Sequence, residues 1–578
     1  VIDKYRFTQV VSTATGYINH GAWFNDDWKV TSKLTLNLGL RWEYEAPPTE
    51  RFDRNWSWHE EVDTGYKINP GWSFEKDAAP KLPAGVPVPN LSGPALGQPL
   101  RVASPGHPER YTWKQDLNNF FPRLGAAFQM NSKTTIRGGF GIIGQGYTGR
   151  GSGPDGTGGH LFSAANGTVL QAGVLHPVTI SNPFPNNAGL LPLTNDPQEI
   201  KDRIAGLTFS GYANTGSDRM PHEYSFNIGV QRELPGRSVV EVSYAGLRGR
   251  DIQGGFHYQV AALPREYLSL GKTLNTQVPN PWYGSNMPIT VGNNGIHTQK
   301  TVEYQQLLQR ITHMNPRGFP GVRYFFPNTS ETWYDALWVR FEKRYSAGFA
   351  LQGNYTYARA DDSTTSPIDG RDEVIRMRTV FNRRHTFAGA ATWDLPVGRG
   401  RRYLGSPSGA GERILEHIVG GWQTSLLTTW MSGLPLRVTQ NLQTLPYSWN
   451  ASAAIAIPRR VSENFRTDLS PKESAHTGTA PAMLDKSAFE VVGPFAIGDD
   501  NGTLPGISGP AFMTNDIAVQ KRFYIYERIH LRFVVQGTNM LNQVNLQNPQ
   551  LNVNNARFGV ISAAYEPRRL QFGLKLVF

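Results

Sequence analysis

Cysteine is absent from this chain of 578 residues, and so is any long apolar run. Without cysteine the protein has no disulfide, no thiolate metal ligand and no cysteine nucleophile. No apolar stretch approaches the ~18 residues that a membrane-spanning helix needs, which excludes an α-helical membrane protein. A membrane-spanning β-barrel is still allowed, because its strands alternate between apolar and polar residues and each scores weakly on hydropathy.

Charge is also scarce. Charged residues make up 18% of the chain, whereas about 25% is typical of soluble globular proteins. The net charge is +11, yet no block of about five or six like charges occurs, and the basic residues are scattered along the sequence. We therefore expect no nucleic-acid partner.

What the sequence does contain is alternation of apolar and polar residues. In LTLNLGLRWEY (34–44) and in the closing RRLQFGLKLVF (568–578), every second side chain is apolar or aromatic. An extended strand separates such residues onto two faces, whereas a helix does not. The same pattern predicts about thirteen strands, at 17–28, 34–44, 123–128, 134–142, 224–231, 239–244, 337–341, 349–357, 385–395, 422–430, 515–523, 529–535 and 570–578.

The connections between these strands alternate in length. Tight turns occur at 30–33, 131–133, 234–237, 345–348 and 524–527. Long segments rich in Pro, Gly, Asn and Ser separate the hairpins, at 46–119, 145–221, 253–331, 361–384, 442–514 and 543–567. One connection, 396–420, is of intermediate length although the alternation calls for a short one there. It carries a short helical period from Glu412 to Val419. A transmembrane barrel has short periplasmic turns and long extracellular loops, and a compact soluble domain seldom tolerates so many long loops.

The pattern therefore predicts an all-β fold, a transmembrane antiparallel up-and-down β-barrel. In such a barrel the apolar residues face lipid and the polar residues face the lumen. A large soluble β-propeller or solenoid is the competing fold, but no fixed repeat period is apparent. The alternation assigns seven candidates to the lumen: Arg41, Glu43, Gln231, Arg340, Glu342, Arg532 and Gln536. Each can be a hydrated wall position or a contact for a passing solute.

Several segments resemble one family. They include WFNDDWKVTSKLTLNLGLRWEYEAPPTERFDR (23–54), EYSFNIGVQRELPGRSVVEVSYAGLRGR (223–250), YDALWVRFEKRYSAGFALQGNYTYARADD (334–362) and RRLQFGLKLVF (568–578). Together they resemble the Oar-like branch of the TonB-dependent outer-membrane receptors. By the same resemblance, Phe572, Leu574, Leu576 and Phe578 are similar to the C-terminal signal that the barrel-assembly machinery recognises.

The resemblance implies a larger protein, with an N-terminal domain, a plug with a TonB box, and a 22-stranded barrel. Neither plug nor box is visible, and an odd number of strands does not close a bacterial single-chain barrel. We therefore expect residues 1–578 to form the C-terminal part of the barrel, with the remaining strands and the plug on a portion outside this sequence.

The resemblance also implies a function and a place. We expect a receptor or transporter in the outer membrane of a Gram-negative-type bacterium that moves a peptide, glycan or chelated metal. Its partners would be outer-membrane lipid and lipopolysaccharide, the TonB system and the barrel-assembly machinery. Two alternatives stay open: a passive porin, and a structural or adhesive protein that acts through its large loops, for which the aromatic-rich 55–72 and 279–295 are suited.

Residues that usually mark catalysis occur without the context they need. Gly139, Gly141 and Gly144 fit G-x-G-x-x-G, but the residues that follow would not form the helix that meets a pyrophosphate. His222-Glu223 lacks a second histidine at helical spacing, and acidic pairs such as Asp361-Asp362 lack the twelve-residue calcium loop. We expect no enzyme, no cofactor and no metal site.

Overall fold

A computed structural model gives the fold of the chain. The structure describes residues 5–8, 15–16, 18–47, 49–51, 53, 56–63, 67–91, 96–101, 103–105, 108–111, 115–146, 166–169, 212–213, 219–252, 258–259, 263–284, 299–309, 323–324, 330–365, 374–441, 457–467, 482–496, 498–499, 503–526 and 529–578. Among these, no helix is long and apolar enough to cross a membrane.

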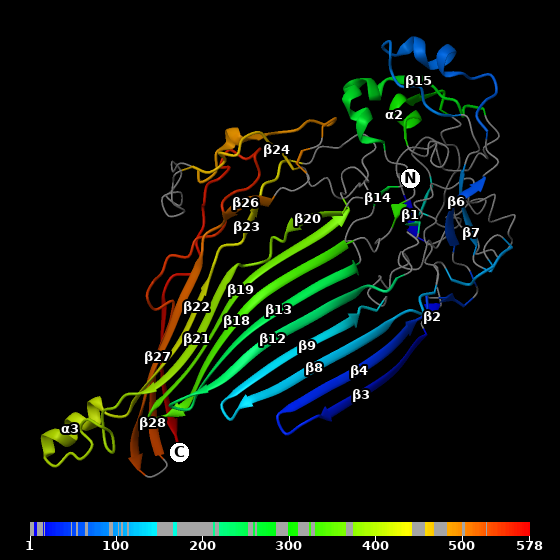
Figure 1. Cartoon of the computed structure of the whole chain (residues 1–578). Helices are drawn as coiled ribbons and strands as arrows, with labels where there is room; N and C mark the ends of the chain where they lie inside the picture. Colours follow the sequence, from blue (N-terminus) through cyan, green and yellow to red (C-terminus); the bar gives the residue numbers. More distant parts are fainter. Residues whose placement is uncertain are drawn as a thin grey trace, which may run out of the picture.

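A single antiparallel sheet of 14 strands dominates the structure, and it forms one curved wall (Figure 1). Thirteen of the strands follow each other in chain order, as the alternation predicted. They are β3 (Asn19–Lys29), β4 (Leu34–Glu45), β8 (Phe120–Asn131), β9 (Thr134–Gly144), β12 (His222–Leu234), β13 (Ser238–Ile252), β18 (Ser330–Ser346), β19 (Phe349–Thr365), β21 (His385–Asp394), β22 (Trp422–Met431), β27 (Phe512–Tyr526), β28 (Ile529–Thr538) and β29 (Arg569–Val577). Within the described residues, β3 pairs only with β4 and β29 only with β28, so the sheet is open at both edges.

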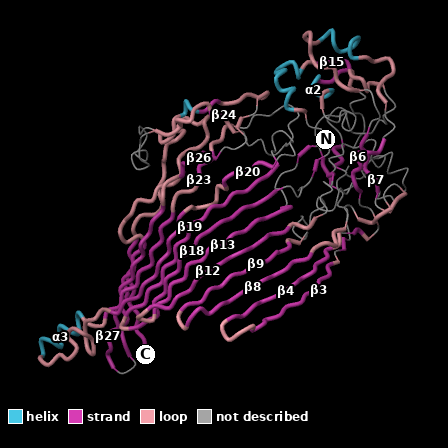
Figure 2. Tube along the Cα trace, in the orientation of Figure 1, coloured by secondary structure: helices cyan, strands magenta, loops and turns pink. Residues whose placement is uncertain are grey.

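The tight turns all lie at one end of the wall, together with the C-terminus (Figures 1 and 2). The turn between β18 and β19 shows why it is tight. Ala347 and Gly348 both have positive φ, at 52° and 81°, as a two-residue hairpin turn matched to the twist of the strands requires. The long connections leave from the other end. We call these the turn end and the loop end.

Several strands are longer than the alternation predicted. β18 and β19 each have 17 residues, whereas about 9 to 11 are enough for a tilted strand to cross a bilayer. Their extra residues lie toward the loop end. There β19 pairs with a strand that the sequence did not predict, β20 (Val374–Arg378), instead of with β21.

The register gives the sheet two chemically different faces. Directly opposed residues in an antiparallel pair share a face, and Leu38, Leu124, Phe140 and Phe226 form such a row across β4, β8, β9 and β12. This apolar face is uncovered: Leu574 is 66% exposed. The opposite, polar face carries the residues between them, such as Asn37. Exposed hydrocarbon over a whole sheet face is the arrangement that lipid requires.

The loop end carries short strands and helices rather than irregular chain. Strand pairs are β1 (Tyr5–Thr8) with β10 (Asn166–Val169), β2 (Thr15–Gly16) with β5 (Thr49–Glu50), β6 (Trp56–Asp63) with β7 (Leu96–Arg101), β15 (Gln277–Pro279) with β16 (Thr301–Glu303), β23 (Pro435–Arg437) with β26 (Thr503–Ser508), and β24 (Arg459–Arg460) with β25 (Phe489–Glu490). A three-stranded sheet joins β11 (Tyr212–Ala213), β17 (Arg323–Tyr324) and β14 (Tyr258–Gln259). The helices are η1 (Phe74–Ala78), η2 (Ala79–Lys81), η5 (Arg265–Asn275), α2 (Tyr304–Leu307) and η8 (Lys486–Ala488).

Two hydrophobic clusters hold several of these segments together, although the sequence indicated only long loops there. The first joins 67–91, 263–284 and 299–309 around Phe74, Trp282 and Tyr304. The second joins segments of 435–507 to 553–561 around Leu436 and Phe558. Both lie at the loop end of the wall (Figure 1).

The turn end carries one helix, α3 (Ala410–Val419), inside the connection between β21 and β22. It occupies the 412–419 period that the sequence predicted as helical. It projects from the wall beside the turns (Figure 1).

Candidate functional site

All seven residues predicted to line the lumen lie on the polar face. Gln231 opposes Glu241, and Glu241 opposes Arg340, so these side chains form a row across β12, β13 and β18. Arg41 and Glu43 point to the same side of β4 as Asn37, since strand residues two apart share a face. That this face lines a lumen stays a prediction.

Most of these side chains have a polar partner on the same strand or on the neighbouring one. Arg41 forms an ion pair with Glu43, and the Arg340 guanidinium lies 3.0 Å from the Glu342 carboxylate. Gln536 donates to the Gln571 side-chain oxygen over 3.2 Å. These residues are exposed or half-exposed, so each pair contributes only about 0–1 kcal/mol to stability. Their charges are therefore available to a solute or a second protein surface.

A longer polar chain crosses the polar face near the turn end. Arg532 donates to the Gln520 side-chain oxygen over 2.9 and 2.6 Å, and Gln520 in turn donates to Gln423. Gln423 donates to Asp394 over 2.8 Å. The network links β28, β27, β22 and β21. Sequence reasoning selected only Arg532, although the alternation of 422–430 and 515–523 already placed Gln423 and Gln520 on the polar side.

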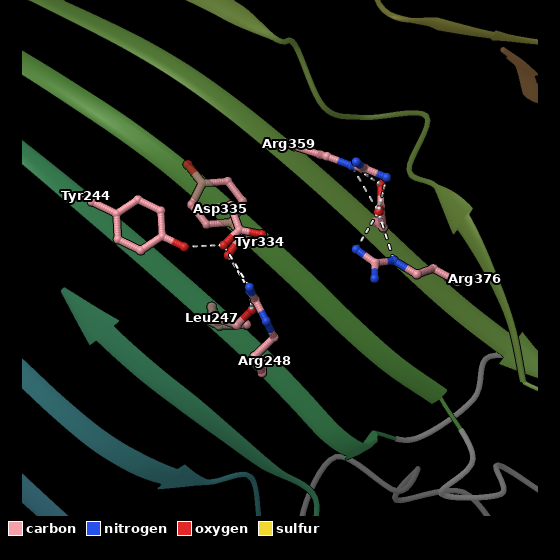
Figure 3. A network of polar contacts seen from close by, with 8 residues as sticks. Tyr244, Leu247, Arg248, Tyr334, Asp335, Arg359 and Arg376 are labelled. Atoms are coloured by element: carbon pink, nitrogen blue, oxygen red, sulfur yellow. Dashed lines mark hydrogen bonds and ion pairs between the residues drawn. The ribbon is translucent and has the colours of Figure 1, made fainter.

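Charged residues also occur on the apolar face, where the alternation gave no reason to expect them. Arg248 Nη2 lies 2.7 Å from Asp335 Oδ1, and Tyr244 donates its hydroxyl to the same oxygen. Arg248 also donates to the main-chain oxygens of Leu247 and Tyr334, both over 2.8 Å (Figure 3). Asp335 lies about eleven residues from the turn-end terminus of β18, which is the length that crosses a bilayer. The group therefore lies at the outer boundary of the membrane.

A second ion cluster lies farther toward the loop end. The Asp361 carboxylate is 3% exposed and lies 2.7 Å from Arg376 Nη2 and 3.0 Å from Arg359 Nη2 (Figure 3). Arg376 stacks over the Trp333 ring at 4.3 Å. The pairing joins β20 to β19 and explains how a strand without apolar alternation stays attached to the wall.

A pocket opens beside these clusters at the ends of β12, β13 and β18. Its volume is ≈ 530 Å³, and its lining is polar: Arg219, His222, Tyr224, Arg248, Arg250, Asp251 and Glu331. His222 contacts the Met220 oxygen at 3.1 Å and the Tyr224 hydroxyl at 3.2 Å. Within the described part of the chain, no group of three or more His, Cys, Asp or Glu residues is placed to hold a metal ion. The polar, arginine-rich lining of this pocket suits a polar or anionic group.

The first hydrophobic cluster at the loop end is tightly packed. Tyr304 is fully buried in the first cluster and donates its hydroxyl to the Pro87 oxygen, and burial raises the pKa of Tyr304. Trp72 Nε1 donates to the Pro279 oxygen over 3.0 Å, and Trp282 is 2% exposed. The sequence assigned Trp72 to a sugar- or protein-binding loop, whereas the structure packs this side chain against a core. Residues 285–295 of the other such loop lie outside the described residues.

A half-buried cation, Arg437, lies beside the second cluster, between Leu436 and Val438. Burial lowers the pKa of Arg437, and the charge of Asp362 opposes that shift. Arg437 lies on β23 and Asp362 on the loop-end part of β19. The two opposite charges therefore attract each other between β23 and the loop-end part of β19.

The proposed assembly signal lies in β29. Phe572, Leu574 and Leu576 project from the apolar face of this edge strand, and Phe578 is 92% exposed. Their accessibility is compatible with recognition by another protein, which stays a prediction.

Comparison of the chain with known proteins assigns it to a family. The model of the family described as "Outer membrane beta barrel domain" matches residues 3–571. Among solved structures, P. aeruginosa FpvA bound to a ferric pyoverdine aligns at 10% identity over 98% of this chain and 39% of that one, with a TM-score of 0.37. The ferric yersiniabactin uptake receptor FyuA from Yersinia pestis aligns at 8% identity over 98% of this chain and 46% of that one, with a TM-score of 0.37. The ferric-catecholate import receptor Fiu from E. coli K12 aligns at 8% identity over 97% of this chain and 44% of that one, with a TM-score of 0.34.

This chain thus spans less than half the length of those receptors. No curated protein matches it significantly. The family match extends over nearly the whole sheet, from β3 to the start of β29. The chain therefore belongs to the outer membrane β-barrel domain family, and the outer membrane is its location.

Proposed function

We propose that this chain forms most of the barrel wall of a TonB-dependent outer-membrane receptor of the Oar-like branch, which moves a ligand across the outer membrane. The observation that carries the proposal is the pair of hydrophobic clusters folded over the loop end of the wall. A passive pore needs no such folded surface outside, whereas a receptor needs one to capture its ligand.

The open edges support a larger barrel. In hydrocarbon, an unpaired backbone N–H or C=O group costs several kcal/mol, so a sheet that spans a membrane has no free edge. β3 and β29 have free edges within the described residues. We infer that further strands pair with both edges, and that they and a plug are supplied by a segment outside residues 1–578.

The polar face is then the inner surface of the barrel. Its row of Gln231, Glu241 and Arg340 and its chain of Arg532, Gln520 and Gln423 offer donors and acceptors to a plug or a passing solute. A peptide, a glycan or a chelated metal can each use such groups. On the apolar face, we propose lipopolysaccharide headgroups as the neighbours of Arg248 and Arg376.

The test compares energised uptake with passive flow. Cells that depend on the intact protein are supplied with a peptide digest, a glycan mixture or ferric citrate, with and without TonB. We expect growth on one class, lost when either the protein or TonB is removed. The purified protein should give no steady conductance in a planar bilayer.

Steady conductance without an energy source would identify a porin instead. Growth unaffected by TonB, combined with binding of cells or surface polymers through the loop end, would identify an adhesive protein. Both outcomes overturn the proposal.

A further inference from the structure

Helix α3 lies where a β-barrel needs only a short turn, and its sequence is amphipathic. Ile414, Leu415, Ile418 and Val419 occupy one side of the helix. Glu412, Arg413, Glu416 and His417 occupy the other side. This division into two halves is typical of a helix that lies along a boundary between apolar and polar surroundings.

No described part of the chain covers the apolar side of α3. No residue of the helix is buried, and Ile414 and Ile418 are 63% and 59% exposed. Left in water, these isoleucines forgo the stabilisation of about 1.5–3 kcal/mol each that burial of such a side chain contributes. The apolar side is therefore free to meet a surface outside the described chain.

The contacts of α3 place it on the apolar side of the wall. Trp422 opposes Lys521, and Lys521 opposes Phe533, so these side chains share the apolar face. Lys521 Nζ donates to the main-chain oxygens of His417 and Ile418, and Trp422 Nε1 donates to the Ile418 oxygen over 3.0 Å. The C-terminus of α3 is thus fixed to the surface that faces lipid.

These contacts also set which side of the helix faces outward. The polar side turns toward the protein, because the His417 ring lies 5.9 Å from the Phe523 ring and Glu416 accepts a hydrogen bond from the Arg399 N–H over 3.1 Å. The apolar side is left facing away from the wall. Leu574 lies in one row with Lys521, and Leu576 in one row with Phe523, so α3 is attached to the same uncovered apolar face that these leucines occupy.

The chain before α3 adds positive charge at the same level. Arg399, Arg401 and Arg402 are all exposed. Arg401 pairs with Asp394 over 3.0 Å, whereas the Arg402 guanidinium lies over the Tyr403 ring at 5.5 Å. Exposed arginines beside a half-exposed tyrosine are typical of the membrane–water interface, where cations meet lipid phosphates and aromatic rings lie at headgroup level.

We propose that α3 is an interfacial membrane helix: its apolar side inserts into the periplasmic leaflet of the outer membrane, and the Arg399–Arg402 segment binds the phosphates of anionic phospholipids. Lys521 and Trp422 anchor it to the barrel. The occupant is lipid because α3 is attached to the lipid-facing surface. Interfacial helices of this kind bury their apolar face about 5–10 Å below the headgroup boundary.

The absence of cysteine makes the test direct, since every introduced cysteine is the only one in this chain. The intact protein is reconstituted in phosphatidylethanolamine–phosphatidylglycerol bilayers as the I414C, L415C or R413C variant, each carrying an environment-sensitive fluorophore. Quenching is measured with nitroxide-labelled lipid and with iodide in the water. R413C, on the polar side of the same helix, is the matched control.

We expect lipid quenching several-fold stronger at I414C and L415C than at R413C, and iodide quenching in the reverse order. Lowering the protein-to-lipid ratio should leave this difference unchanged. Equal iodide quenching at all three positions would overturn the proposal. The apolar side of α3 would then be in contact with water, and a periplasmic protein would be needed to cover it. Loss of the difference on dilution in lipid would overturn it as well, since a second copy would then be the occupant.

Discussion

Lys521 Nζ donates a hydrogen bond of 3.1 Å to the main-chain oxygen of Ile418, which lies 103 residues earlier in the chain. A lysine on the lipid-facing surface of a barrel costs up to about 2–4 kcal/mol if it has no partner. The last carbonyl groups of a helix have no partners within the helix and carry partial negative charge. Each group thus supplies what the other lacks, and the contact ties α3 to β27.

Replacing Lys521 by Met should therefore release α3 without unfolding the barrel. The ammonium contacts to His417 and Ile418 are lost, while a methionine is well tolerated on the apolar face. A spin label at Arg413→Cys should become more mobile, and the heat-modifiable barrel band on gels should persist. Arg522→Met, on the opposite face of the same strand, should leave the label unchanged; an equal gain in mobility there would contradict the anchor.

The first turn of α3 should depend on pH through Glu412. Its carboxylate accepts hydrogen bonds from the Ser408 N–H over 2.9 Å and from the Ser408 hydroxyl over 3.1 Å, and these lower the pKa of Glu412 below its ordinary value of 4.5. A lowered pKa in the folded state means that the contribution is complete above pH 4.5 and is lost as the pH falls through the lower folded value.

A spin label at Ala410→Cys should therefore gain mobility only below about pH 4.5. In a Glu412→Gln background the same label should be more mobile at neutral pH and show no such transition. A transition that persists without Glu412 would assign the pH response to another group.

The buried carboxylate of Asp361 should hold β20 in place. Changing Asp361 to Asn leaves Arg376 and Arg359 without their shared partner. Because both arginines are half-exposed, we expect a loss of about 1–3 kcal/mol in local stability rather than the larger cost of a fully buried pair. Hydrogen exchange of the β20 amides measures this loss.

A double-mutant cycle with Arg376→Gln provides the control. If the ion pair carries the stability, the two single losses of stability should not add. The double variant should lose less than their sum, by at least about 0.5 kcal/mol. Strict additivity would show that Asp361 and Arg376 act independently.

Trp282 should be required for the first cluster at the loop end but not for the barrel. Trp282→Ala removes a fully buried side chain, at a cost of about 3–5 kcal/mol. Limited proteolysis should then cut within 263–309, while the barrel band persists. Tyr283→Ala, at a neighbouring residue that is 41% exposed, should leave the digestion pattern unchanged; similar cleavage in both variants would contradict a cooperative cluster.

The strands could be predicted from the sequence because alternation is a local property that lipid on one side and water on the other impose directly. Leu34 to Tyr44 and Leu570 to Phe578 carry it without interruption, and both lie in strands of the observed sheet. The excess length of β18 and β19 was missed because these residues extend past the membrane. There a charge such as Asp335 or Asp361 on the apolar face meets an arginine instead of lipid.

The loop-end clusters and the anchor of α3 could not be predicted, because they depend on contacts between distant segments. The Tyr304 hydroxyl donates a hydrogen bond to the Pro87 oxygen, 217 residues away in the sequence. No local sequence pattern at either residue indicates that the two meet. The period of 412–419 predicted the helix itself but gave no sign of Lys521. The seven polar-face candidates follow from strand parity alone, which is why they were placed on one face while their hydrogen-bond partners were missed.

Lipid should cover the even-numbered side chains of β4, and water the odd-numbered ones. Single cysteines at 35 to 40, introduced into the intact protein in bilayers and labelled with a spin probe, test it through collision rates with oxygen in the lipid and a nickel chelate in the water. We expect oxygen access to peak at Leu36, Leu38 and Leu40 and nickel access to peak at Thr35, Asn37 and Gly39. A profile without a period of two, or equal nickel access on both faces, would contradict the account.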